Sequence, residues 1–178
     1  MSKFEALVNI LDQIRAEGTS LGFLSYGPSA EDLESINQAR ARAYIHLYLK
    51  VKFGLLDFSE RDGFVTDGPQ DGGIDGYFID KDAKTIHLIQ SKFRTSEANF
   101  SNKKITLNEI SAMDVGRISS GEQLDEKGVP YSGKIKRLMR EISEIEDVGR
   151  YKYHVTIIAN TPEISNNLLR NLRRWFSS

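Results

Sequence analysis

The chain has 178 residues, of which 39% are hydrophobic and 28% are charged, a composition typical of one folded domain with its own core. It has no cysteine, which excludes disulfide bonds, thiol catalysis and cysteine-ligated zinc. No apolar run approaches the roughly 18 residues that span a bilayer, and the N-terminal segment has no signal-peptide cleavage site. We therefore expect a cytoplasmic protein that does not act at a membrane.

The charge is nearly balanced overall, with a net value of −1, so no global positive field indicates a nucleic-acid partner. Residues 1–89 hold 9 Lys/Arg and 14 Asp/Glu, whereas residues 90–178 hold 15 and 11. The acidic half has carboxylates that could hold a cation. The alternative is a mixed, solvated surface, the commoner outcome for charge clusters. Candidate phosphate contacts in the basic half are Lys103, Lys104, Lys134, Lys136, Arg137, Arg140, Arg170, Arg173 and Arg174.

Two helices are predicted before residue 55. Ser2 and Glu5 form a capping-box pattern, and the apolar stripe that follows predicts a helix ending at Gly18. Ser29 with Asp32 forms a second capping-box pattern, and its helix continues to Gly54. The Asp- and Gly-rich segment that comes next predicts a loop with at most a short strand at 64–66.

A β-hairpin is predicted from 73–79 and 85–93, joined by a turn at 80–84. Its second strand is apolar on both faces except for Gln90 and Lys92, which favours a central place in the sheet. A polar loop follows from residue 94 to residue 105.

The C-terminal half predicts helix, helix, strand and helix. Thr106 with Glu109 caps the first helix, which runs to about residue 118 and precedes a long exposed loop. Apolar spacing from Ile135 to Ile145 predicts the second helix. Residues 151–160 are predicted to form a strand, and Pro162 marks the start of the last helix.

This order of elements predicts an α/β fold with a mixed sheet flanked by helices. We expect one domain over 1–178, made of an N-terminal helical extension at 1–28 and a core at 29–178. The apolar pair Trp175 and Phe176 near the end suggests that the natural chain continues, so further C-terminal domains remain open.

One segment resembles a nucleotide-binding motif but lacks two of its features. Residues 128–134, GVPYSGK, match the beginning of a phosphate-binding loop. However, Ile135 stands where a Ser or Thr would hold magnesium, and no strand precedes the segment. A glycine-rich loop with Ser132 capping the next helix explains the pattern better.

Calcium storage and histidine chemistry are not expected either. Asp67, Asp71 and Asp75 lie four apart, whereas an EF-hand loop spaces its first ligands two apart. The histidines have no close carboxylate or second histidine in sequence, so we expect them in the core or partly exposed: His46, His87 and His154.

The strongest functional candidate is the set Asp75, Gln90 and Lys92. Gln90 and Lys92 are two apart on one strand, so their side chains share a face, and Asp75 begins the preceding strand. A charged lysine on a central strand costs several kcal/mol unless it is paired or solvated. A water-filled metal site would remove that cost. The alternative is a Gly-rich turn, an edge residue and two polar strand positions without a function.

The same residues resemble a known superfamily. The pattern GGIDG followed by IQSK resembles the PD-(D/E)XK, or restriction-endonuclease-like, nucleases, and more closely their Mrr-type branch, in which Gln replaces the acid. The text FVTDGPQDGGIDGYFID…IHLIQSKFR, with ARAYIHLYLKVKFGL upstream, is similar to the N-terminal region of the abortive infection phage resistance (AIPR) family. The strong match covers roughly residues 39–94.

The resemblance implies a restriction-endonuclease-like core with its site on the two hairpin strands. Asp75 matches the metal-binding carboxylate, Gln90 the second metal ligand, and Lys92 the catalytic lysine, while Ser91 would offer its backbone carbonyl. Many relatives add a Glu from the first core helix. That turn falls near Ala43, which cannot serve, and the same helix offers Glu34 or Asn37 as alternatives.

The resemblance further implies a Mg²⁺-dependent endonuclease acting on DNA in anti-phage defence, with Mn²⁺ as a substitute. Arg94 and the basic segment 136–140 would contact the phosphate backbone. An inactive nucleic-acid- or partner-binding module on the same fold is the rival hypothesis. A ribonuclease and a homodimer also remain open.

Overall fold

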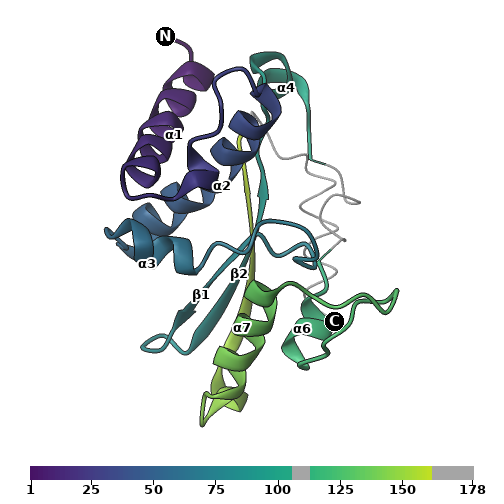
Figure 1. Ribbon diagram of the computed structural model, residues 1–178. Helices are drawn as coiled ribbons and strands as arrows, with labels where there is room; N and C mark the ends of the chain where they lie inside the picture. The colour runs from purple at the N-terminus through teal and green to yellow at the C-terminus, as the bar shows by residue number, and fades with distance from the viewer. Residues whose placement is uncertain (106–112, 162–178) are drawn as a thin grey trace.

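The computed structural model describes residues 1–105 and 113–161, shown in colour in Figure 1. The predicted last helix lies outside these ranges, and so does the start of the helix predicted from Thr106. The elements of the described ranges are α1 Lys3–Ser20, η1 Leu24–Tyr26, α2 Leu33–Phe53, α3 Phe58–Gly63, β1 Gly76–Asp80, β2 Thr85–Lys92, α4 Glu97–Asn102, α6 Val115–Ser119, α7 Gly133–Ser143, η2 Val148–Arg150 and β3 Lys152–Ala159.

The strands form a small mixed sheet in the order β1-β2-β3. β1 pairs with β2 antiparallel, with Gly76 opposite Ile89, and β2 pairs with β3 parallel, with Gln90 opposite Ile157. This confirms the predicted hairpin, the central place of its second strand and the mixed α/β class. In the part of the chain that is described, no helix is long and apolar enough to cross a bilayer.

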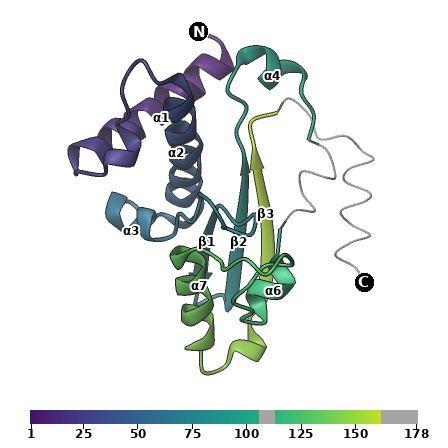
Figure 2. The ribbon, with the colours of Figure 1, turned by 45° about the vertical axis from the view of Figure 1, so that its right-hand side comes forward.

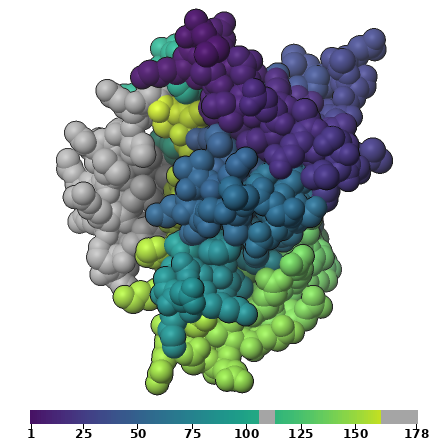
Figure 3. All heavy atoms as spheres, turned by 90° about the vertical axis from the view of Figure 1, so that its left-hand side faces the viewer, coloured from purple at the N-terminus to yellow at the C-terminus, as the bar shows by residue number. Residues whose placement is uncertain are grey.

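Helices cover both faces of β2, because its side chains alternate between two core clusters. Ile86 and Leu88 pack in one cluster with α7 residues such as Leu138. Ile89 packs in another with Ile45 of α2. Figure 2 shows α2 running alongside the strands, with α1 on the side of α2 away from the sheet. From the direction of Figure 3, α1 covers much of the upper surface.

The helix ends follow local capping chemistry, with two corrections. Ser2 and Glu5 form the expected reciprocal capping box, but α1 continues past Gly18 to Ser20. The expected cap of α2 at Ser29 is wrong, because Asp32 is the N-cap and its carboxylate accepts from Ser35 N–H at 2.9 Å. α2 ends at Gly54 as predicted, and Ser132 caps α7 as predicted.

Two short helices, α3 and α4, lie where loops were predicted. Each has six residues, too few for an apolar period to be recognised. Their start signals are nevertheless local: the Asp57 side chain accepts from Glu60 N–H, and the Ser96 side chain accepts from Asn99 N–H. The short strand considered at 64–66 is a single bridge between Val65 and Gly76.

A buried polar network joins α1, η1, α2 and α3. Arg61 is fully buried, and its Nε donates to Nδ1 of His46 at 3.3 Å. This leaves the ring proton of His46 on Nε2, 2.7 Å from the Tyr26 hydroxyl, which donates to Asp62. Glu17 neutralises Arg61. His46 is thus a core residue, as expected, and burial lowers its pKa.

Candidate metal centre

Three carboxylates converge where the loop after α3 enters β1. One oxygen from each of Asp67, Asp71 and Asp75 lies within 4.8 Å of the others. From the sequence the three aspartates were weighed together only as an EF-hand loop, and of the three only Asp75 was predicted to be a metal ligand, alongside Gln90 and Ser91. Their convergence depends on the path of the loop, and the four-residue spacing by itself does not predict that path.

The loop folds around the Asp71 side chain. Its carboxylate accepts hydrogen bonds from Gly68 N–H at 3.2 Å and from Gly73 N–H at 2.8 Å. Burial raises the pKa of Asp71, and the two N–H groups oppose this rise because they favour the ionised form. Asp71 therefore shapes the loop and presents a carboxylate to its neighbours.

Gly72 fixes the loop against the C-terminal half of the chain. Its φ of +62° is in the left-handed region, and a Cβ there would lie 2.8 Å from Ile118 Cδ1 and 3.0 Å from Tyr131 Cε1. The N–H of Asp114 donates to Gly72 O at 2.8 Å. Only glycine fits this position, so α6 and the segment before α7 determine how the carboxylates are placed.

Asp75 is held against the start of β1 and the end of β2. Its N–H donates to Ile89 O, and its Oδ2 accepts from Ser91 N–H at 2.6 Å. Burial raises the pKa of Asp75 to about 7; the Ser91 N–H opposes the rise, and the charges of Asp71 and Asp67 add to it. A proton or a cation is therefore needed to stabilise this group in the fold.

β2 brings the expected residues to the same region. The N–H and C=O of a strand residue point to the same side, so the Ser91 carbonyl faces the edge where Asp75 lies. Gln90 is 2% exposed, and its Oε1 is buried with no hydrogen-bond partner among the described residues. A buried, unsatisfied acceptor is costly, which indicates a missing ligand.

Lys92, the expected catalytic lysine, has a side chain without a partner in the described chain. Within residues 1–105 and 113–161 it forms no hydrogen bond or ion pair. Burial raises the pKa values of Asp71 and Asp75, and the positive charge of Lys92 opposes this rise at both groups, so the ammonium group lies in the field of the carboxylates. The structure thus brings Lys92 near Asp75 while leaving its three N–H donors available.

The contribution of α2 differs from the expected helix ligand. Ala43 packs in an apolar cluster, whereas Glu34 and Asn37 line a hollow beside Phe93. The residue of α2 that reaches the carboxylates is Arg42, whose Nε donates to Asp67 Oδ2 at 3.1 Å. Nothing in the sequence distinguishes Arg42 from Arg40, the other arginine of this helix, so only the structure identifies it.

The predicted phosphate contacts divide into four groups. Lys103, Lys104, Lys136 and Arg140 are exposed on the surface. Arg94 is 8% exposed and donates to Lys104 O, so the expectation that it contacts phosphate is not supported. Lys134 donates to Val65 O, and Arg137 pairs with Glu141. The last three candidates, Arg170, Arg173 and Arg174, lie outside the described residues.

Comparison of the chain with protein-family models, with curated proteins and with solved structures found no match. The resemblance to the PD-(D/E)XK and AIPR proteins therefore stays a prediction from the sequence.

The donor set fits a hard divalent cation. Carboxylate, amide and carbonyl oxygens are the ligands that Mg²⁺ and Mn²⁺ prefer. The described chain brings three carboxylates together. It also offers Gln90 Oε1, which has no hydrogen-bond partner, and the carbonyl of the adjacent Ser91. The raised pKa values of Asp71 and Asp75 point the same way, since a bound cation would stabilise the ionised carboxylates.

Proposed function

We propose that this chain is a metal-dependent nuclease that hydrolyses phosphodiester bonds of DNA, built on a restriction-endonuclease-like core. The observation that carries the proposal is the set of three carboxylates within 4.8 Å of one another, next to a lysine that forms no ion pair with a described residue. The resemblance to the AIPR family suggests a role in abortive infection, a form of anti-phage defence.

The residues have separate roles in this proposal. Asp75 and Asp71 would hold a divalent cation, with Gln90 Oε1 and the Ser91 carbonyl as further oxygen ligands. When bound, the cation would polarise the scissile phosphate and lower the pKa of a water. The Ser91 N–H keeps Asp75 oriented and favours its ionised form.

Lys92 would act on the substrate. A compact ammonium on a flexible stem can orient the attacking water or stabilise the charge that develops on the phosphate. Arg42 positions Asp67, because it draws that carboxylate toward α2 by their ion pair. The exposed Lys136 and Arg140 would contact the phosphate backbone without reading its sequence.

The test is a cleavage assay with the purified chain on plasmid DNA, single-stranded DNA and RNA, in Mg²⁺ or Mn²⁺ and in EDTA. We expect Asp75→Ala and Lys92→Ala to lose activity by about 100-fold or more, as is typical when an electrostatic catalytic group is removed. Lys50→Ala, an exposed lysine of α2, should retain it. Full activity in the Lys92 variant, with an unchanged melting temperature, would contradict the assignment.

A binding module on the same fold is the second candidate. The ion pair of Arg42 with Asp67 favours it, because one carboxylate of the site already has a protein cation as its partner. Thermal unfolding with and without Mn²⁺ separates the two, since a ligand of the native state raises its stability. Metal-dependent stabilisation without cleavage of any of the three substrates would favour the binding module.

A further inference from the structure

The outer edge of β1 is paired over only part of its length. Val65 bridges Gly76, and Tyr77 N–H donates to Phe64 O at 2.9 Å, which uses the start of this edge. Ile79 lies two residues further on, so its N–H and C=O point to the same edge as those of Tyr77. Within the described chain, no backbone or side-chain group is bonded to them.

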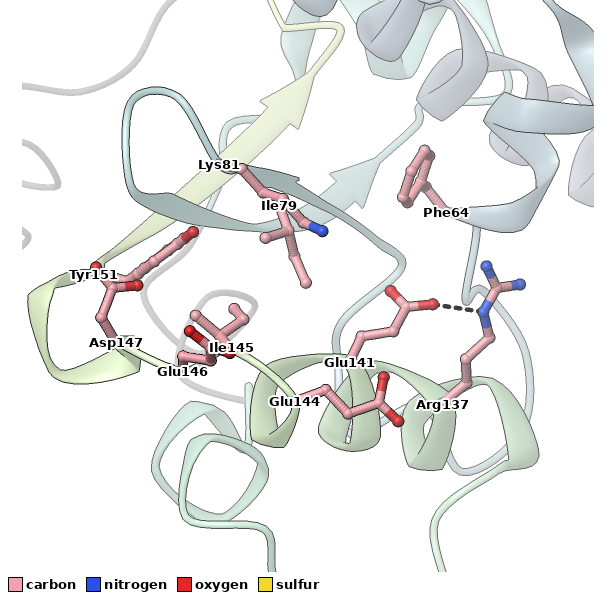
Figure 4. A pocket seen from close by; sticks show the side chains of 10 residues that line it. All are labelled: Phe64, Ile79, Lys81, Arg137, Glu141, Glu144, Ile145, Glu146, Asp147 and Tyr151. Carbon is pink, nitrogen blue, oxygen red and sulfur yellow. Dashed lines mark hydrogen bonds and ion pairs between the residues drawn. The ribbon is translucent and has the colours of Figure 1, made fainter.

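Two hollows flank this free edge, one on each face of β1. A hollow of about 660 Å³ lies between β1 and α7 (Figure 4), and one of about 420 Å³ lies beside Phe53 and Phe78. Both hollows are lined by Ile79 and Lys81, so both open on the same stretch of backbone. Figure 3 shows the hairpin and α7 next to each other at the surface.

The hollow on the α7 side is acidic. Its lining contains four carboxylates and two cations. One carboxylate pairs with Arg137 and another with Lys84. Glu144 and Glu146 are exposed and form no ion pair with any residue in the described ranges. Because like charges repel, this hollow disfavours nucleic-acid phosphates and favours a cationic partner.

The hollow on the other face is lined by two aromatic rings and by charged side chains. Phe53 stacks on Phe78 with 4.4 Å between ring centroids, and both line the hollow. A strand added to β1 would direct alternate side chains to the two faces of the sheet. One set would meet the Glu144 side, and the other set would meet the phenylalanines.

We propose that the free edge of β1 binds an extended partner peptide in which basic and apolar residues alternate. Backbone hydrogen bonds to Ile79 hold the peptide as a fourth strand. Its Lys or Arg side chains pair with Glu144 and Glu146, and its apolar side chains pack on Phe53 and Phe78. The free stretch from Phe78 to Lys81 accommodates about four peptide residues, or roughly 14 Å. The surface is independent of the proposed metal centre.

The experiment is a fluorescence-anisotropy titration of the chain with a fluorescein-labelled peptide of alternating Arg and Val, about eight residues long. We expect saturable binding of this peptide, and binding at least tenfold weaker for two control peptides, namely the same residues in two blocks and the alternating peptide with every residue N-methylated. In the block peptide, basic and apolar side chains no longer point to opposite faces of the sheet. N-methylation removes the N–H donors needed for strand pairing.

Protein variants test the acidic face separately. The double variant Glu144→Lys/Glu146→Lys should bind the alternating peptide at least tenfold more weakly, whereas Glu31→Lys/Glu60→Lys, with the same charge change at exposed sites elsewhere, should bind it normally. Lys92→Ala should also bind it normally. Equal affinity for the blocked peptide, an unaffected Glu144/Glu146 variant, or no binding would each overturn the proposal.

Discussion

Replacing Asp75 by Asn should stabilise the metal-free protein and remove its response to metal. The substitution keeps the shape of the side chain, and the Asn oxygen can still accept the hydrogen bond from Ser91 N–H. It removes a carboxylate whose ionisation is opposed by burial and by the charges of Asp71 and Asp67. A group that weakens the apo fold while serving a ligand is typical of a functional site.

The size of the effect follows from the raised pKa. Asp75 has a pKa of about 7 in the fold against 3.8 for the free side chain. At 1.36 kcal/mol per unit, ionised Asp75 costs the fold up to about 4 kcal/mol. Between these pH values the folded state binds more protons than the unfolded chain, so stability falls as pH rises through this window. Above about pH 7 the whole cost is present.

The assay is urea unfolding of the wild type, Asp75→Asn and the control Asp82→Asn at pH 4 and pH 8, with EDTA or with Mg²⁺. In EDTA at pH 8 we expect Asp75→Asn to gain about 1–4 kcal/mol, and at pH 4 the gain should largely vanish. Mg²⁺ at 100 times its Kd should add about 2.7 kcal/mol to the wild type and nothing to the variant. The control changes an exposed carboxylate.

Two results would refute this reasoning. If Asp75→Asn were no more stable than the wild type at pH 8, burial would not oppose ionisation of the carboxylate. If the variant kept the full Mg²⁺ stabilisation, Asp75 would not be a metal ligand. The two outcomes are independent, so each part of the reasoning can fail separately.

Two further predictions concern the scaffold around the site. Gly72→Ala should lower the free energy of unfolding by about 1–3 kcal/mol in urea, because of its positive φ and the contact with Ile118, whereas Gly116→Ala, where a Cβ meets open space, should not. Tyr26→Phe should lower it by about 1–3 kcal/mol at pH 7, since the buried Nε2 of His46 loses its partner. An unchanged unfolding midpoint in either variant would contradict the described packing.

Much of the architecture follows from local patterns in the sequence. The Ser2 cap, the end of α2 at Gly54 and the Ser132 cap each depend on residues within one turn of the chain. The central place of β2 followed from apolar residues on both of its faces, because a strand buried on both sides cannot alternate. Six-residue helices such as α3 escaped recognition because their apolar period is too short.

Only part of the candidate site was predicted from the sequence. Asp75, Gln90 and Lys92 were selected because polar groups on a buried strand need a partner. The convergence of Asp67 and Asp71 on Asp75 was decided by tertiary structure, as was the contact from Arg42.

The physical reason is that loop conformation depends on distant packing. The path that brings the three carboxylates together includes a positive φ at Gly72, where Ile118 and Tyr131 leave no room for a Cβ. These residues come from a part of the chain far along the sequence, so no pattern within the loop specifies their contact. The sequence by itself determined the strands and caps, because these are stabilised by interactions between residues close together in the chain. Only the tertiary structure decided where the acidic side chains meet.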